Sequence, residues 1–302
     1  MQPSDEVLTQ FGVQLAAPLG GRVNQHWLVE AQGKQLVLRC WGHSPLIDDA
    51  ASHTASTSYE VRLVASLAAL GWPVAPPVMG PVEIGDQVWS LAPFLSGELP
   101  AIDSKIHGGH AEQRTRGRLL AEFHVGMAQV PEMGRRPGWR RCEEILADPL
   151  LDTVLNTNEQ ERPEEVCILR WHLERARERV AELQPSSWPG VVVHGDFTPW
   201  NLRFTDGRLS GILDFELAHW DHRVGDFVLS WRGKYDNVVL RYNEVSPLGP
   251  EEWALIAPLW WAQLIQGACI DMQRGIVSDG WTINKLLLRS PLMGKDAAEY
   301  KA

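Results

Sequence analysis

The stretch "VVVHGDFTPWNLRFTDGRLSGILDFE", residues Val191 to Glu216, carries the strongest signal in this chain of 302 residues. It places Asp196, Asn201 and Asp214 close together, each beside a short apolar run that is typical of a buried strand. Charged side chains are rarely left near a core without a partner or a task. The stretch therefore indicates either a dense hydrogen-bond network or a site for a metal ion and a substrate.

The spacing within this stretch matches an arrangement used for phosphoryl transfer. His194, Asp196 and Asn201 give the pattern H-x-D-x-x-x-x-N, and "DFE" begins 13 residues after Asn201, beyond the turn "TDGR" and the strand "LSGIL". Protein kinases use H-x-D-x-x-x-x-N followed by D-F-G for their catalytic and metal loops. Phosphoryl transfer needs one carboxylate that accepts the proton of the attacking hydroxyl, and hard oxygen ligands for magnesium. By chance this register is expected on the order of once in several thousand such chains.

The first ninety or so residues read as strands and turns broken by one helix. Glycine residues flank two strand-like runs, "GGRVNQHWLVEA" and "GKQLVLRCW", which predicts a hairpin. "SYEVRLVASLAALGW" has apolar residues at helical spacing and a stop at Gly71. "VAPPVMGPV" is read as a proline-rich connection and "QVWSLAPFLSG" as a strand that ends in a turn.

Beyond about residue 100 the pattern becomes helical, most clearly in "AEQRTRGRLLAEFHVGMAQV" and "PEEVCILRWHLERARERVAELQ". In the second segment the apolar residues alternate steps of three and four, which predicts a helix with one core-facing side. A strand-rich first third followed by helices predicts an α+β fold with two lobes, residues 1–95 and 96–302. We expect a ligand site in the cleft between the lobes.

Composition excludes several classes of protein. The net charge of -10 argues against a general nucleic-acid binder, which needs a basic surface. The four cysteines are scattered and form no CxxC pair, so neither a zinc site nor a disulfide framework is indicated. The polar, acidic N-terminus does not resemble a signal peptide, and we expect a cytoplasmic protein.

One apolar segment touches the length of a membrane span. Residues 253–270, "WALIAPLWWAQLIQGACI", carry no formal charge. Pro258, Gln263 and Gln266 interrupt the segment, and no basic flank orients it. We therefore expect a buried helix and no membrane partner.

The sequence motif "HGDFTPWN…LDFE" resembles that of the aminoglycoside phosphotransferase and choline kinase-like family, the small-molecule branch of the protein-kinase-like fold. The resemblance extends over nearly the whole chain. It covers "LGGRVNQHWLVEA" as a nucleotide-loop hairpin, "LVLRCW" as the third strand, "SYEVRLVASLAALGWPVAPPV" as a helix and linker, "LAEFH" as a helix of the large lobe, and "RVGDFVLSW" as the segment after the metal loop. It implies a bilobal fold with a small β-rich N-lobe and a larger, mostly helical C-lobe.

The resemblance also implies roles for individual residues. Asp196 is the candidate catalytic base, and Asn201 and Asp214 are the candidate Mg²⁺ ligands. Gly20 and Gly21 would let the loop between strands approach the phosphates of ATP or GTP.

Two more features of the nucleotide site follow from the resemblance. Pro93 and Leu95 would face the nucleobase through backbone groups, and Glu60 would pair with a basic residue on the third strand. The family's usual lysine is replaced there by Arg39, and the nearest lysine, Lys34, lies in the turn before the strand. Arginine keeps the charge and binds phosphate, with a different reach and geometry.

Some polar residues have simpler interpretations. His194 is expected to brace the loop rather than to transfer protons. His219 and His222 flank Asp221 at a spacing seen in metal sites, but without a third clustered ligand they favour a surface turn. Glu216 is assigned a supporting role.

The leading hypothesis is a Mg²⁺-dependent kinase that moves the γ-phosphate of ATP, or of GTP, to a hydroxyl of a small molecule. The acceptor would be an antibiotic, an amino alcohol, an amino acid or a sugar, and the protein a monomer or a homodimer. A nucleotide-binding pseudokinase without turnover is the first alternative. It stays open because Arg39 replaces the family's usual lysine. A metal-dependent hydrolase that uses His194 and Asp196 is the second.

Overall fold

The computed structural model describes residues 2–21, 23–43, 50–100, 109–131, 133–185, 188–228, 236–276, 280, 282–283 and 286. The chain divides into two compact units by its internal contacts. Unit 1 consists of Met1–Pro100, Gly126–Trp139 and Pro199–His219. Unit 2 consists of Ala101–Val125, Arg140–Thr198 and Trp220–Ala302. The boundary expected at residue 95 and the cleft between lobes stay predictions.

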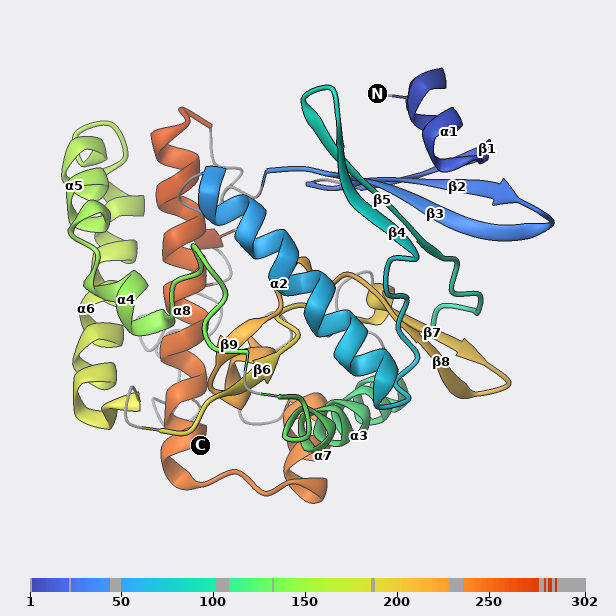
Figure 1. Cartoon of the computed structure of the whole chain (residues 1–302). Coiled ribbons are helices and arrows are strands. Elements are labelled where there is room, and N and C mark those ends of the chain that lie inside the picture. Colours follow the sequence, from blue (N-terminus) through green and yellow to red (C-terminus); the bar gives the residue numbers. More distant parts are fainter. Residues whose placement is uncertain are drawn as a thin grey trace. The chain divides into compact units, whose positions relative to one another are not determined.

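Unit 1 is built on a five-stranded antiparallel sheet with the order β1-β2-β3-β5-β4 (Figure 1). The strands are β1 Gln14–Gly20, β2 Gln25–Ala31, β3 Lys34–Trp41, β4 Met79–Ile84 and β5 Gln87–Pro93. The hairpin expected around Gly33 is confirmed as β2 and β3. Gln32 and Gly33 link these strands with φ of 51° and 74°, the left-handed values that a tight two-residue hairpin turn requires.

The two faces of this sheet have different tasks. On β3, Leu38 and Cys40 point into a core where they are 0% and 7% exposed. Because side chains alternate along a strand, Val37, Arg39 and Trp41 lie on the opposite face, where they line a cavity. The core face is completed by Val7, Phe11, Val13, Trp27, Val29, Trp89 and Leu91. One face of the sheet therefore holds unit 1 together and the other is free to bind a ligand.

Two elements of unit 1 differ from the sequence expectation. Helix α1, Asp5–Phe11, is a second helix in the first ninety residues, where one was expected. Ser4 Oγ accepts the N–H of Val7 and Gly12 ends the helix at a φ of 63°, so both caps were readable in the sequence. The region read as a proline-rich connection, residues 74–82, contains the first part of β4, which tolerates Pro81 because it is an edge strand.

The remaining elements of unit 1 agree with the expectation. Helix α2 spans Ala50–Ala69; the predicted helix began later, at Ser58. Strands β7 Leu202–Thr205 and β8 Arg208–Ile212 form a hairpin at the turn expected at "TDGR", and β8 includes most of the expected strand "LSGIL". Short 3-10 helices, η2 Pro199–Asn201 and η3 Phe215–Leu217, flank that hairpin.

Unit 2 is mostly helical. Its helices are α3 His110–Met127, whose last two residues belong to unit 1, then α4 Cys142–Ala147, α5 Pro149–Asn158, α6 Pro163–Leu183, α7 Asn237–Val245 and α8 Pro250–Gln273. Strand β6 Val191–Val193 pairs with β9 His219–Asp221, and the 3-10 helix η4 Arg223–Phe227 follows. The two long helices predicted from the sequence are confirmed as α3 and α6.

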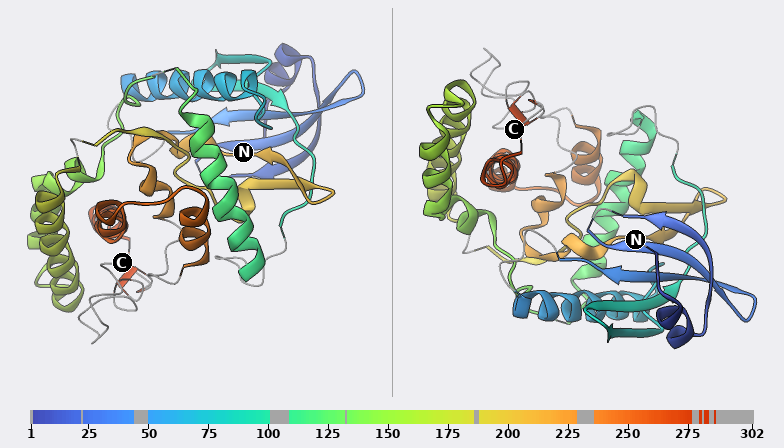
Figure 2. Two further views of the ribbon diagram at one scale, coloured as in Figure 1. Left: turned by 90° about the horizontal axis from the view of Figure 1, so that it is seen from below. Right: turned by 90° about the horizontal axis from the view of Figure 1, so that it is seen from above.

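Helix α8 is the centre of unit 2. Figure 2 shows it end-on beside α5 and α6, the helices it packs against. By length and composition α8 is apolar enough to cross a membrane, but 67% of its apolar window is buried within the protein. The expectation of a buried helix is therefore confirmed.

Candidate functional site

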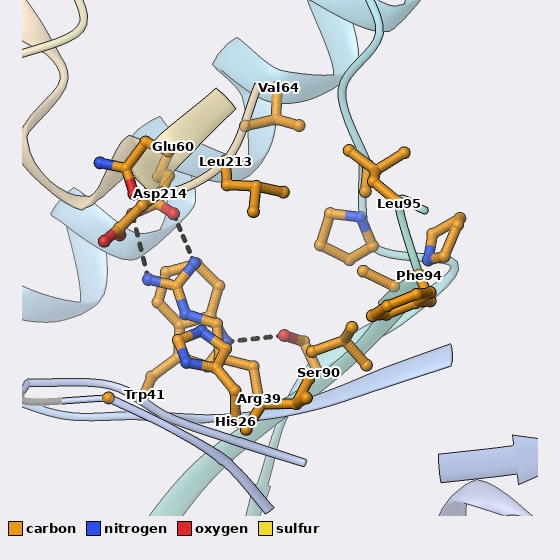
Figure 3. A pocket seen from close by; sticks show the side chains of 18 of the residues that line it. His26, Arg39, Trp41, Glu60, Val64, Ser90, Phe94, Leu95, Leu213 and Asp214 are labelled. Carbon is orange, nitrogen blue, oxygen red and sulfur yellow. Dashed lines mark hydrogen bonds and ion pairs between the residues drawn. The ribbon is translucent and has the colours of Figure 1, made fainter. Parts of the chain in front are cut away.

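Unit 1 contains a cavity of about 620 Å³ on the open face of its sheet. Nine residues were given a catalytic, metal-binding or nucleotide-binding role from the sequence, and eight of them line this cavity: Gly20, Gly21, Arg39, Glu60, Pro93, Leu95, Asn201 and Asp214. Figure 3 shows Arg39, Glu60 and Asp214 grouped at one end of this cavity and Phe94 and Leu95 at the other. The residues come from the sheet, from α2, from the segment around β7 and β8, and from the loop between β1 and β2 that carries Gly20 and Gly21, here called the glycine loop.

The charged end of the cavity is organised by an ion pair. Arg39 Nη1 lies 2.5 Å from Glu60 Oε1, and the guanidinium sits 3.6 Å from the ring centroid of Trp41 (Figure 3). The Nε of Arg39 is buried and has no hydrogen-bond partner within the described part of the chain. Lys34, in contrast, is exposed at the start of β3 and does not line the cavity. The geometry therefore favours Arg39 over Lys34 as the basic residue of the third strand.

A second arginine, which the sequence analysis missed, holds Glu60 from the other side. Arg136 is 4% exposed, and its Nη2 lies 3.2 Å from Glu60 Oε2. Burial alone would raise the pKa of Glu60, but the guanidiniums of Arg39 and Arg136 lower it below its ordinary value. Glu60 therefore stays ionised between two cations, although its side chain is only 3% exposed.

Arg136 also fixes the chain just after Asp214. Its Nη1 donates to the backbone carbonyls of Phe215, at 3.0 Å, and Ala218, at 2.8 Å, while its Nε donates to Ser56 Oγ at 2.6 Å. One side chain thus ties α2 to η3. In the sequence Arg136 stands in "GRRPGW", which reads as a surface loop, so no local signal marks it.

The glycine loop is shaped by close backbone approach. Gly21 has a φ of 132°, and a Cβ at this position would lie 1.8 Å from the carbonyl oxygen of Asn24. The Asn24 side chain accepts the N–H of Gly42 at 3.0 Å and donates to Glu216. Glu216 therefore links the loop to the segment after Asp214, in line with the supporting role assigned from the sequence.

The opposite end of the cavity offers backbone groups. The N–H of Phe94 donates to Gln35 across the sheet, at 3.3 Å. Because backbone groups alternate sides along a strand, the carbonyl of Pro93, the last residue of β5, points away from β3. Pro93 and Leu95, two residues beyond the strand, both line the cavity. This arrangement suits the recognition of a planar heterocycle by backbone donors and acceptors.

Asn201 and Asp214 lie on the cavity wall near Arg39. The carbonyl of Asn201 accepts the N–H of Leu213 at 2.8 Å, which joins the two segments that carry the predicted metal ligands. Asp214 has a φ of 63° and a ψ of 70°, a left-handed conformation that is uncommon for residues other than glycine. Such strain costs on the order of 1 kcal/mol and is concentrated at functional sites.

Asp196, the ninth predicted residue, belongs to unit 2 and is half-buried there. Its N–H donates to Nδ1 of the buried His194 at 3.2 Å, which is the bracing role expected for that histidine. Asp226 accepts the backbone N–H groups of His194, at 2.8 Å, and of Gly195, at 2.5 Å. The buried carboxylate of Asp226 therefore fixes the backbone of the loop that carries Asp196.

That carboxylate is itself fixed by two further side chains. His124 Nε2 lies 2.8 Å from Asp226 Oδ2, and its Nδ1 lies 2.8 Å from the hydroxyl of Tyr242. Burial would raise the pKa of Asp226, but its hydrogen bond with His124 and the charges of His124 and His194 lower it. The segments "LAEFH" and "RVGDFVLSW" meet in this network, although residues 229–231 of the second lie outside the described residues.

The surface turn expected for His219 and His222 is wrong. Both side chains are buried, at 6% and 2% exposure. His219 stacks on Trp139 with ring centroids 4.6 Å apart and bonds to the carbonyl of Leu217. His222 lies beside Glu143, a residue 79 positions earlier that the sequence could not connect to it.

Comparison with known families decides the assignment. Residues 14–255 match the family described as the phosphotransferase enzyme family. The chain belongs to the phosphotransferase enzyme family. The resemblance inferred from "HGDFTPWN…LDFE" is thus confirmed over most of the chain.

Proteins similar to this chain include homoserine kinases. That of Rhodospirillum rubrum is 26% identical over 187 residues, which are 57% of this chain and 53% of the relative. The chain thus spans about half the length of the curated relatives it matches, at 53% and 57% of the first two.

Solved phosphotransferase structures share the fold. A GDP complex of a variant of aminoglycoside 2′-phosphotransferase-IIIa has a TM-score of 0.66 at 18% identity, with 97% of this chain and 95% of that chain covered. Amicoumacin kinase in complex with AMP-PNP, Ca²⁺ and Ami has a TM-score of 0.63 at 14% identity, with 92% and 89% covered. The expected α+β, protein-kinase-like fold is confirmed, with the sheet in unit 1 and most helices in unit 2.

Proposed function

We propose that this chain is a kinase that transfers the γ-phosphate of ATP, or of GTP, to a hydroxyl group of a small molecule. The observation that carries the proposal is the cavity of unit 1. Eight residues expected from the resemblance, drawn from positions 20 to 214, line this one space. Membership of the phosphotransferase enzyme family supports the same reaction class.

The cavity has the chemistry of a nucleotide site. Arg39 presents an Nε without a hydrogen-bond partner in the residues described, and guanidinium donors bind phosphate oxygens well. Gly20 and Gly21 bring backbone close to the same space, while Pro93 and Leu95 offer backbone groups to a nucleobase. In this proposal Glu60 holds Arg39 in place and does not touch the nucleotide.

The residues present also fit a divalent cation. Asn201 and Asp214 supply an amide oxygen and a carboxylate, which are the hard donors that Mg²⁺ prefers. When bound there, Mg²⁺ would neutralise charge on the phosphate oxygens. The Arg136 bonds to Phe215 and Ala218 fix the chain directly after Asp214, whose backbone is strained. In this proposal they keep the Asp214 carboxylate oriented for the cation.

Asp196 supplies the base in this proposal. Its carboxylate orients the acceptor hydroxyl and accepts its proton as the oxygen attacks the phosphorus. The loop that carries Asp196 is held by the backbone bonds to Asp226 and by His194.

The acceptor in this proposal is a small molecule, and neither a nucleic acid nor a membrane is a partner. The names of similar proteins support small-molecule acceptors: homoserine kinase among the relatives and amicoumacin kinase among the solved structures. We further propose a cytoplasmic monomer or homodimer.

The test combines binding and turnover. Calorimetry with ATP and GTP, each with and without Mg²⁺, should show one Mg²⁺-dependent nucleotide site. ADP or GDP release should then be screened with homoserine, choline, amino sugars and aminoglycosides. Nucleotide binding without release in a wide acceptor screen would favour the pseudokinase. Failure of both nucleotides to bind would reject the kinase reaction, and nucleotide-independent hydrolysis that requires His194 and Asp196 would favour the hydrolase.

A further inference from the structure

Three side chains of unit 2 converge on one buried point. Glu143 lies on α4, Asp221 ends β9, and His222 caps the start of η4. One ligand atom from each of these residues lies within 4.8 Å of the others. His222 Nε2 is 3.5 Å from Glu143 Oε1 and 3.8 Å from Asp221 Oδ1. All three come from unit 2, whereas Asn201 and Asp214 belong to unit 1.

Two members of this cluster, His222 and Glu143, have side-chain polar atoms without a hydrogen-bond partner among the described residues. His222 is 2% exposed, and neither of its ring nitrogens has a hydrogen-bond partner among the residues that the structure describes. The same holds for both carboxylate oxygens of Glu143, whose side chain is 18% exposed. Buried polar atoms are nearly always satisfied, and exceptions point to a water or ion at the site. An imidazole nitrogen that faces two carboxylates is a donor set for a cation.

The local charge points the same way. Two carboxylates lie side by side, and burying like charges is costly unless a cation neutralises them. Arg141 Nη1 forms an ion pair with Glu143 Oε1 at 3.9 Å, beyond hydrogen-bond distance, so this one cation offsets only part of the charge of the two carboxylates. Two neighbouring arginines are engaged elsewhere, Arg140 with Asp148 and Arg223 with Glu252.

The spacing of the donor atoms fits a small divalent ion. Ligands at about 2.0–2.1 Å from a tetrahedral Zn²⁺ lie about 3.3–3.4 Å from each other. His222 Nε2 is 3.5 and 3.8 Å from the two carboxylate oxygens, and the three donor atoms lie within 4.8 Å of one another, so ion binding would draw them together. The ring of His222 is also held in place, since it meets Trp188 edge-on with centroids 5.5 Å apart. The backbone N–H of His222 donates to Asp221 Oδ1 at 2.7 Å, which orients that carboxylate.

We propose that Glu143, Asp221 and His222 bind a divalent transition-metal cation of the Zn²⁺ type. One imidazole nitrogen and two carboxylate oxygens suit Zn²⁺ better than Mg²⁺ or Ca²⁺, which prefer oxygen donors alone. The ion clips α4 to the turn between β9 and η4 and so stabilises unit 2. This proposal does not depend on the phosphotransferase reaction.

The experiment measures Zn²⁺ binding to the untagged, full-length protein without nucleotide. EDTA-treated protein, freed of chelator, is titrated with ZnCl₂ in a calorimeter, and its melting temperature is recorded with and without the ion. We expect one site per chain and a higher melting temperature with Zn²⁺, because a ligand that binds only the folded state stabilises it. His222→Gln and Glu143→Gln should each weaken Zn²⁺ binding by at least about tenfold and abolish the thermal shift.

Two controls separate this site from others. Asp214→Asn, in unit 1, and His172→Gln, a buried histidine that bonds to the Ile168 carbonyl, should keep both the binding and the shift. Glu143→Gln is the deciding variant if His222→Gln fails to fold, because Glu143 is more exposed and the amide keeps its shape. The proposal is overturned if the wild type binds no Zn²⁺. It is equally overturned if Glu143→Gln binds Zn²⁺ as the wild type does.

Discussion

At the scale of single residues, Arg39 and Lys34 show how register decides a role. The two cations lie on the same strand, five positions apart, yet only Arg39 lines the cavity. Arg39→Ala should raise the nucleotide dissociation constant roughly tenfold or more, because a charge-assisted hydrogen bond contributes about 1.5–3 kcal/mol. Lys34→Ala should leave it unchanged. Calorimetry with Mg-ATP checks both variants, and the reverse result would assign the phosphate contact to Lys34.

Substitutions of the two aspartates of the proposed site, Asp196 and Asp214, should have different effects. Asp196→Ala should lower the single-turnover rate roughly a hundred- to ten-thousandfold, the range for loss of a positioned general base. Nucleotide affinity should barely change in this variant. Asp214→Ala should weaken Mg²⁺-dependent nucleotide binding as well as turnover. If metal-dependent binding is lost at Asp196 and kept at Asp214, the proposed roles are reversed.

The acid stability of unit 1 should depend on Glu60. The neighbouring arginines lower the pKa of Glu60 in the folded state, so its stabilising effect is present above its ordinary pKa, 4.5, and is lost as the pH falls through the lowered value. Urea midpoints measured from about pH 7 to about pH 3 should therefore fall less steeply for Glu60→Gln than for the wild type.

Glu159 provides the matched control for this acid effect. Its pKa is also lowered, by Arg170, but it is fully exposed, so Glu159→Gln should follow the wild-type profile. Equal acid slopes for Glu60→Gln and the wild type would show that the buried ion pair does not govern acid unfolding.

At the scale of elements, Arg136 joins α2 to the 3-10 helix after Asp214. Arg136→Met should destabilise unit 1 by about 3 kcal/mol, because it removes one partner of a buried ion pair and leaves two carbonyls without their donor. Turnover should fall as well, since the backbone after Asp214 loses its anchor. Arg135→Met is the matched control, because the adjacent Arg135 is exposed.

Denaturant midpoints and single-turnover rates measure both effects of the Arg136 change. Because lysine has no planar fork with which to reach Glu60, Ser56 and two carbonyls at once, Arg136→Lys should restore little. A fully active and stable Arg136→Met variant would contradict the anchoring role.

How far the sequence predicts these elements depends on how local their causes are. The hairpin at Gly33 and the apolar face of α6 follow from spacing along the chain, and both were predicted. Strand β4 was missed because Gly80 and Pro81 mask it, and only its pairing with β5 makes it a strand. Arg136 and Glu143 carry no local signal, because their partners lie 76 and 79 positions away in the sequence.

At the scale of the whole molecule, α8 should act as a core and not as an anchor. Leu255 is 0% exposed on this helix, so Leu255→Asp buries an unpaired carboxylate and should sharply lower soluble yield and melting temperature. Gln273→Asp, at the exposed end of α8, should change neither. The wild type should remain in the supernatant after ultracentrifugation without detergent. Recovery in the membrane pellet, with release by Leu255→Asp, would instead identify α8 as an anchor.

Unit 1 is built from three separate segments of the chain, and this affects how it can fold during synthesis on the ribosome. Its sheet is complete in the first 100 residues, but Arg136 and Asp214 arrive in the segments Gly126–Trp139 and Pro199–His219. Chains elongate at about 5–20 residues per second, so roughly 4–15 seconds pass between the synthesis of Glu60 and that of Arg136. Once β5 has been made, the nascent sheet still lacks part of its cavity wall, and Glu60 lacks one of its two cations until Arg136 follows. Nascent chains stalled before residue 136 should therefore be cleaved by protease more readily than chains stalled after residue 219.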